Sequence, residues 1–125
     1  MIGGDSRLDL PPVPMAATLA RDFVRQCSTD LEVDDVVDAL VLCASEMVTN
    51  ALDHAAPPYR LTVSRWPDRV RIAVADASVR LPVLRAASAV SERGRGIFIL
   101  EAMANRWGVD PTPAGKTVWA EFLTT

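Results

Sequence analysis

Three polar side chains with useful chemistry, Glu46, Asn50 and His54, lie four residues apart in one segment of the chain. On an α-helix this spacing places them on one stripe about 12 Å long. Asn50 offers an amide oxygen, a ligand that Mg²⁺ accepts together with phosphate oxygens, and Glu46 can accept a proton one turn away. The stripe therefore predicts a site for Mg²⁺ and phosphate groups. The same spacing is also typical of the solvated side of a helix, and spacing alone does not separate the two.

One further polar residue, Asp53, accompanies this stripe. Asp53 lies beside it in the sequence, and His54 is the only histidine of the chain. An imidazole at this position can contact a phosphate or a water molecule, and it fits a surface position at the end of a helix equally well.

Asp76 follows an alternating apolar segment, residues 70–75, so we expect it where a strand runs out into a loop. A carboxylate there can accept a hydrogen bond from an exocyclic amine such as that of adenine, which distinguishes adenine from guanine. An aspartate that ends a strand is also a common turn residue, and both interpretations remain open.

Glycines and arginines alternate at 93–96, as Arg93, Gly94, Arg95 and Gly96, before a short helix predicted to start near Ile97. Backbone amides and guanidinium groups at a helix N-terminus form a plausible phosphate site, although two glycines at this spacing most often mark a turn. Later in the chain, Thr117 enters the last predicted strand. Its hydroxyl could lie near a nucleotide base or belong to a simple hairpin turn.

The elements that must position these residues follow from the hydrophobic pattern. Helical periodicity covers 15–26, ending near 28–30, and 33–55, where prolines stop it. Strands are expected at 7–10 on an edge, in a hairpin that turns at 67–68, and at 107–109 and 117–122. We expect residues 1–125 to form one α/β (α+β) domain. Its two-layer sandwich would have a mixed, mostly antiparallel sheet with helices on one face.

Composition excludes several other classes of protein. Half of the 125 residues are hydrophobic and 23% are charged, which argues against disorder. A net charge of −3 argues against direct nucleic acid binding through a basic face, and no apolar run is long enough to predict a membrane span. Cys27 and Cys43 are not spaced as metal ligands and are expected to be reduced thiols in a cytoplasmic protein.

Taken together and in order, Glu46-x-x-x-Asn50-Ala51-x-x-His54, Asp76, the segment 93–101 and Gly115-Lys116-Thr117 resemble the sequence boxes of GHKL-type, histidine kinase-like ATP-binding proteins. The chain is most similar to the small anti-sigma-factor serine/threonine kinases of bacteria. This resemblance, which covers roughly residues 16–122, implies the Bergerat ATP-binding fold with residues 77–95 as a lid over the nucleotide. A histidine kinase catalytic domain or a zinc hydrolase fits the sequence less well.

The resemblance also implies roles for the residues. Asn50 would hold Mg²⁺ and Glu46 would be the catalytic base, while Asp76 would bind the adenine amine with the help of Thr117. Asp53, His54 and the run Arg93, Gly94, Arg95, Gly96 and Ile97 would complete the ATP site.

Relatives of this kind phosphorylate a serine of an anti-anti-sigma factor and bind a sigma factor, usually as homodimers. One position departs from the pattern, since Ser78 stands where a glycine is usual after the aspartate. Two functions therefore remain open, a protein kinase that regulates a sigma factor by sequestration and a non-catalytic nucleotide-binding or partner-binding module.

Overall fold

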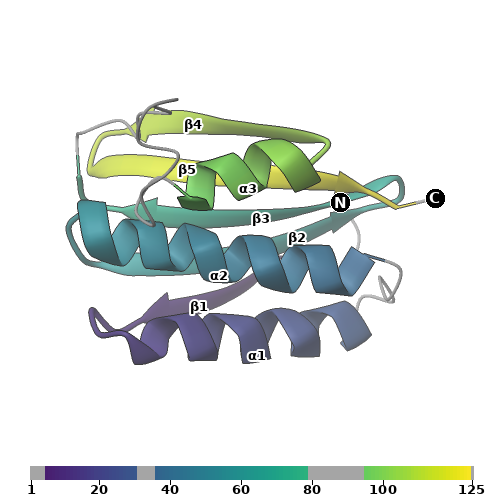
Figure 1. Cartoon of the computed structure of the whole chain (residues 1–125), viewed down its shortest axis with the longest axis horizontal. Helices are drawn as coiled ribbons and strands as arrows, with labels where there is room; N and C mark the ends of the chain where they lie inside the picture. The colour runs from purple at the N-terminus through teal and green to yellow at the C-terminus, as the bar shows by residue number, and fades with distance from the viewer. Residues whose placement is uncertain (1–4, 31–35, 79–94, 125) are drawn as a thin grey trace.

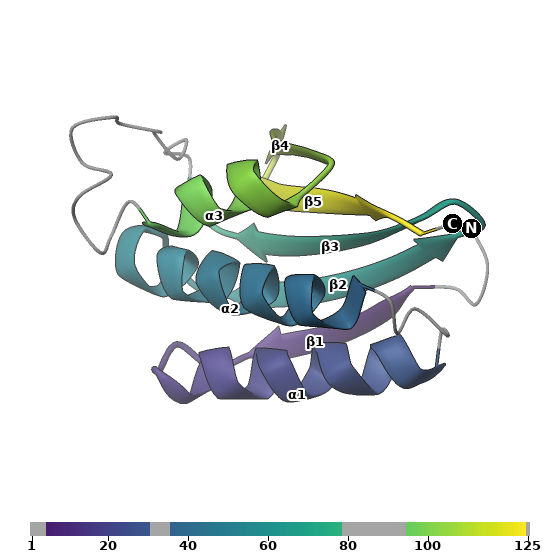
Figure 2. The same cartoon turned by 45° about the vertical axis from the view of Figure 1, so that its right-hand side comes forward.

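The computed structural model describes residues 5–30, 36–78 and 95–124. Within them, five strands form one sheet in the order β1-β2-β3-β5-β4, and every pairing is antiparallel. Helices α1, α2 and α3 lie side by side on one face of that sheet (Figures 1 and 2). The predicted two-layer α+β sandwich is confirmed, and no parallel pair occurs among the described strands.

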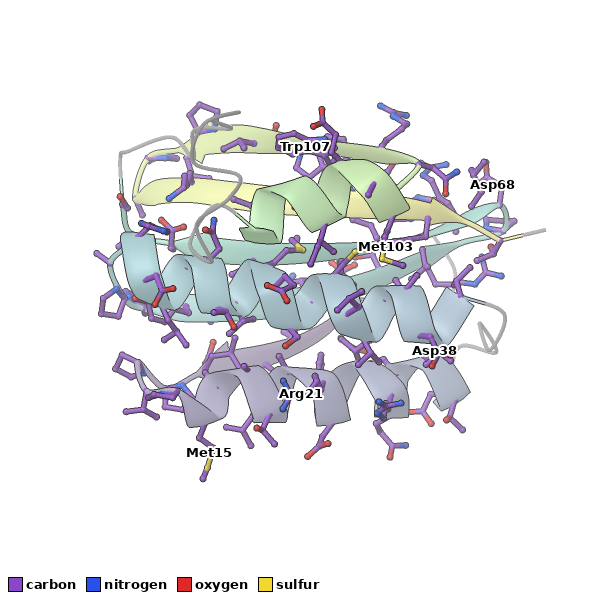
Figure 3. The ribbon with its side chains drawn as sticks, in the orientation of Figure 1. Met15, Arg21, Asp38, Asp68, Met103 and Trp107 are labelled. Atoms are coloured by element: carbon purple, nitrogen blue, oxygen red, sulfur yellow. The ribbon has the colours of Figure 1, made fainter. Side chains whose placement is uncertain are left out.

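The first half of the chain builds one edge of the sheet and the two long helices. Strand β1 (Ser6–Leu10) ends at the prolines, and α1 (Met15–Asp30) and α2 (Val37–His54) follow. Both helices lie where the periodicity predicted them, although the predicted start of the second, at 33, falls on residues outside the description. The guanidinium of Arg21 in α1 donates a 2.9 Å hydrogen bond to the hydroxyl of Ser45 in α2, so the two helices are joined by a polar contact (Figure 3).

The second half supplies the centre of the sheet and its other edge. Strands β2 (Tyr59–Trp66) and β3 (Arg69–Asp76) form the predicted hairpin, and α3 (Arg95–Met103), β4 (Arg106–Thr112) and β5 (Gly115–Leu123) complete the fold. The closing strands are longer than predicted. Pro111, expected to lie outside a strand, is accommodated in β4 because this strand is at the edge of the sheet, where a missing N–H does not break a ladder.

Alternation along the central strands separates the two faces of the sheet. Val70, Ile72 and Val74 are buried beneath the helices, opposite the buried residues Phe122, Ala120 and Val118 of β5. Burying side chains of this size contributes roughly 1.5–3 kcal/mol each, so this face supplies much of the folding free energy. The same alternation places Asp76 and Lys116 on the helix-covered face, since they continue these two rows.

The face without described helices carries a charged and aromatic cluster. Glu121, whose side chain is only 4% exposed, accepts a hydrogen bond from Arg71 and lies within 4 Å of Arg69 and Arg106 nitrogens. The guanidinium of Arg71 also lies 4.5 Å from the ring centre of Trp119. One buried carboxylate thus forms ion pairs with three arginines of the two neighbouring strands.

Candidate functional site

Several of the predicted site residues lie at one end of the fold, which we call the Asp76 end. Leu10 pairs with Tyr59, and Asp76 pairs with Lys116, so these four residues mark the end of the sheet. The C-terminus of α2 and the first turn of α3 lie at the same end, on the left of Figure 1. The backbone N–H of Ala77 donates a 2.9 Å hydrogen bond to the carbonyl of Ala56, which ties the end of β3 to the segment after α2.

The polar stripe of α2 faces the side on which α3 packs. Ser45, on one flank of α2, contacts α1, so Glu46 and Asn50, about 100° and 140° further round, are directed to the opposite flank. Both side chains are half-buried, whereas Asp53 and His54 are exposed. The structure therefore brings Glu46 and Asn50 together on one flank, with His54 on the same stripe at the helix end and Asp53 turned toward solvent.

Burial and charge act together on a neighbour of Glu46. Burial, and to a smaller extent the negative charge of Glu46, raises the pKa of the Cys43 thiol from 9.0 to about 12. A thiol with such a pKa stays protonated at neutral pH and is a poor nucleophile. Cys43 is therefore a packing residue of α2.

Asp76 lies where the sequence predicted it, at the last position of β3, but its carboxylate already has partners. The ammonium group of Lys116 lies 2.9 Å from Oδ2 and 3.1 Å from Oδ1, and the backbone N–H of Ser78 donates to Oδ1 at 2.8 Å. The side chains of Asp76 and Lys116 are only 2% and 6% exposed. The carboxylate is thus held in a buried ion pair.

Gly115 allows this pair to form. A Cβ atom at this position would lie 2.1 Å from the carbonyl oxygen of Asp76 and 2.7 Å from Cα of Ala77. Only glycine permits the first residue of β5 to approach the end of β3 so closely. The close approach places the next side chain, that of Lys116, beside the carboxylate.

Thr117 does not join Asp76 in this arrangement. It pairs with Ala75, and strand alternation directs its side chain to the face opposite that of Asp76. The sequence motif was correctly placed at the start of β5, but the residue that reaches the aspartate is the preceding one. The signal for Lys116 was a charged residue in phase with the buried positions Val118 and Ala120.

The glycine and arginine segment is only partly described. Arg93, Gly94 and most of the predicted lid, 77–95, lie outside the described residues. Arg95, Gly96 and Ile97 form the first turn of α3, so the helix begins two residues earlier than predicted. Gly96 is tolerated there because the packing of Ile99 and Leu100 against the core holds the helix in place.

The donor types fit a magnesium ion that is shared with phosphates better than a site built from protein alone. Among the described residues no group of three or more His, Cys, Asp or Glu side chains is placed to hold a metal ion. Asn50, half-buried on the stripe of α2, offers a single neutral oxygen of the kind that completes such a shared shell. No described helix is both long and apolar enough to cross a membrane.

Comparison with known proteins identifies the family of the chain. The sequence profile of the histidine kinase-like ATPase domain matches residues 10–122, and the chain belongs to this family. Among solved structures, the RsbU and RsbW domains of Rv1364c from Mycobacterium tuberculosis match with a TM-score of 0.69 and 18% sequence identity. That match covers 96% of this chain and 32% of the other, so this chain spans about a third of its length. No curated protein matches the sequence significantly.

Proposed function

We propose that the protein binds ATP together with Mg²⁺ and acts as an anti-sigma-factor-like protein serine/threonine kinase. Its substrate would be a serine of an anti-anti-sigma factor, and it would regulate a sigma factor by sequestering it, as a cytoplasmic homodimer. The observation that carries this proposal is the half-buried pair Glu46 and Asn50 on one flank of α2, in a histidine kinase-like ATPase fold. The RsbW domain in the similar structure supports the choice of partner class.

Each residue has a defined task in this proposal. Asn50 contributes an oxygen ligand to Mg²⁺, which neutralises charge on the phosphates when it is bound. Glu46, one turn earlier, accepts the proton of the attacking serine hydroxyl. His54 and Asp53 border the site at the end of α2, and the first turn of α3, with Arg95, Gly96 and Ile97, offers backbone amides to a phosphate. Arg93 and Gly94 precede that turn in the chain.

A second function is favoured by a specific observation. The ion pair between Asp76 and Lys116 occupies the carboxylate that would receive the base. A protein of this fold with a blocked base site would act as a non-catalytic nucleotide-binding or partner-binding module. Titration with ATP and Mg²⁺, combined with a phosphotransfer assay, distinguishes the two functions.

The experiment combines calorimetry with phosphotransfer. We expect the wild-type protein to bind ATP in the presence of Mg²⁺ and to phosphorylate a protein that it captures from the native cell. Glu46→Gln should retain ATP binding and lose transfer, with a rate at least about 100-fold lower, because only the proton acceptor is removed. Asn50→Ala should weaken binding of the Mg²⁺ complex.

Asp38→Asn is the matched control for Glu46→Gln. Asp38 is an exposed acid in the first turn of the same helix, at the end away from Asp76 (Figure 3). It should change neither binding nor transfer. Unchanged transfer in Glu46→Gln would refute the role of Glu46, and the absence of ATP binding in the wild-type protein would refute the proposed function.

A further inference from the structure

The ion pair of Asp76 and Lys116 has a second consequence for the proposed ATP site, on which the following inference rests. Lys116 is the only lysine of the chain, and its ammonium group is held inside the fold instead of in solvent. Charged groups that are this deeply buried are rare unless they are paired. Here the partner is the carboxylate expected to recognise the base.

Counting hydrogen bonds shows what the pair does to that carboxylate. Each carboxylate oxygen can accept two hydrogen bonds. Oδ1 of Asp76 already accepts from the ammonium of Lys116 and from the N–H of Ser78, and Oδ2 accepts from Lys116. Counting the partners among residues 5–30, 36–78 and 95–124, one acceptor position on Oδ2 remains, but the side chain is almost fully covered, so an amine from solvent has no access to it.

The surroundings keep the pair in place. Tyr59 is buried at the same end of the sheet, and its hydroxyl donates a 2.8 Å hydrogen bond to the carbonyl of Ala55. Tyr59 continues the register in which Arg60 pairs with Ala75, so it lies next to Asp76 on the neighbouring strand. Burial raises the pKa of Tyr59, and the negative charge of Asp76 raises it further. Gly115 fixes the distance between β3 and β5. The long side chain of Lys116 has four rotatable bonds, so it is the group that can withdraw from the ion pair.

We infer that Lys116 is an internal competitor for the adenine amine and sets the nucleotide affinity of this site. In the nucleotide-free protein its ammonium occupies Asp76, and the base binds only in the fraction of molecules in which Lys116 has withdrawn. The apparent dissociation constant is then the intrinsic constant divided by that fraction. Removal of the ammonium opens the carboxylate to the amine.

The inference predicts a change in ATP affinity of opposite sign to the one expected from long-range electrostatics. ATP is an anion, so the loss of a nearby positive charge should weaken its binding through space. If Lys116 is a competitor, Lys116→Met instead strengthens binding, at least about tenfold, because a charge-assisted hydrogen bond no longer has to be broken. Methionine keeps the length and the apolar part of the side chain.

Arg60→Met is the matched control, since it removes one positive charge from the same end of the sheet. Arg60 pairs in register with Ala75 and is exposed on the other face, where it contacts Asp9. Calorimetry should show unchanged or slightly weaker ATP binding for this variant. Tighter binding by both variants would overturn the inference, because the effect would not belong to the ion pair.

A second test uses the wild-type protein, so its result does not depend on whether the Lys116→Met variant folds. With ¹⁵N-labelled lysine, the protein gives one side-chain ammonium signal, which burial and ion pairing make observable. Binding of ATP, followed by calorimetry on the same sample, should release Lys116 to water and remove that signal through fast exchange. A signal that persists unchanged at ATP saturation would overturn the inference.

The outcomes also separate this inference from the proposed function. If the wild-type protein binds ATP and Lys116→Met binds it equally or more weakly, the competitor role is wrong while nucleotide binding stands. If only Lys116→Met binds, the competitor role is supported in its strongest form, while the proposed function of the wild-type protein is refuted. If neither folded protein binds ATP, both the proposed function and the competitor role are overturned.

Discussion

The buried ion pair allows a quantitative test of the structure itself, by a double-mutant cycle with Asp76→Asn, Lys116→Met and the double variant. Each single change leaves one buried charge without its partner, which typically costs about 3–5 kcal/mol of unfolding free energy. The double variant leaves an amide beside a thioether, and the carbonyl of the new amide can still accept from the N–H of Ser78. It should therefore lose much less than the sum of the single variants.

Urea unfolding followed by circular dichroism at pH 7 measures the cycle. For a chain of 125 residues, roughly 4 °C of melting temperature corresponds to 1 kcal/mol, so each single variant should melt about 12–20 °C lower. The coupling free energy between the two positions should be at least about 2 kcal/mol. An unchanged dependence on urea concentration would show that the variants share the parent fold.

Additive losses of unfolding free energy in the two single variants would refute the reasoning. If the losses of the two single variants add to that of the double variant within about 0.5 kcal/mol, the side chains do not interact as described. Nearly full stability of Asp76→Asn alone would have the same meaning, because a buried ammonium would then need no counter-charge.

Three further predictions concern the rest of the fold. Glu121→Gln should cost about 1–2 kcal/mol, and less in high salt, because the arginines around it are partly solvated. Gly115→Ala should destabilise by more than about 2 kcal/mol and displace the start of β5, since its Cβ would overlap backbone atoms. Above pH 9 the Cys43 thiol ionises only in the unfolded chain until about pH 12, so the unfolding free energy should fall by up to about 1.4 kcal/mol per pH unit, and Cys43→Ala should reduce this slope.

Matched variants and pH series check these three predictions by denaturant unfolding. Asp68→Asn removes an acid from an exposed pair with Arg69 and should cost less than about 0.5 kcal/mol of unfolding free energy. If Glu121→Gln cost no more than this control, the buried contacts of Glu121 with the three arginines would not contribute to stability as described. At Gly108 a Cβ would meet the side-chain ring of Trp119, which can move, and Gly108→Ala should cost less than Gly115→Ala. Identical pH slopes with and without the thiol would contradict its raised pKa.

The fold was predictable because its signals are local. Helical periodicity on α1 and α2 and alternation on β2 and β3 each specify one buried face, and one register satisfies all of them. The boundaries of β4 and β5 were less predictable. An edge strand tolerates Pro111, and whether a strand lies at an edge depends on the order of strands in the finished sheet.

The candidate site was predictable as a set of positions but not as a set of contacts. The stripe on α2 and the place of Asp76 follow from spacing. The choice between Lys116 and Thr117 depends on which of two neighbouring side chains faces the helices, and a shift of one residue reverses that choice. The register of β5 against β3, with Gly115 at the close approach, decides it.

The antiparallel topology also shows where a label or tether can be attached to the molecule. Ser6 begins β1 and Leu123 ends β5. Both lie at the end of the sheet opposite to Asp76, because the other ends of these two strands, at Leu10 and Gly115, lie at the Asp76 end. A fluorophore, an immobilising tether or a fused reporter attached near either residue would project away from the proposed nucleotide entrance. Surface-based kinetics and single-molecule recordings can therefore be made without masking the face under study.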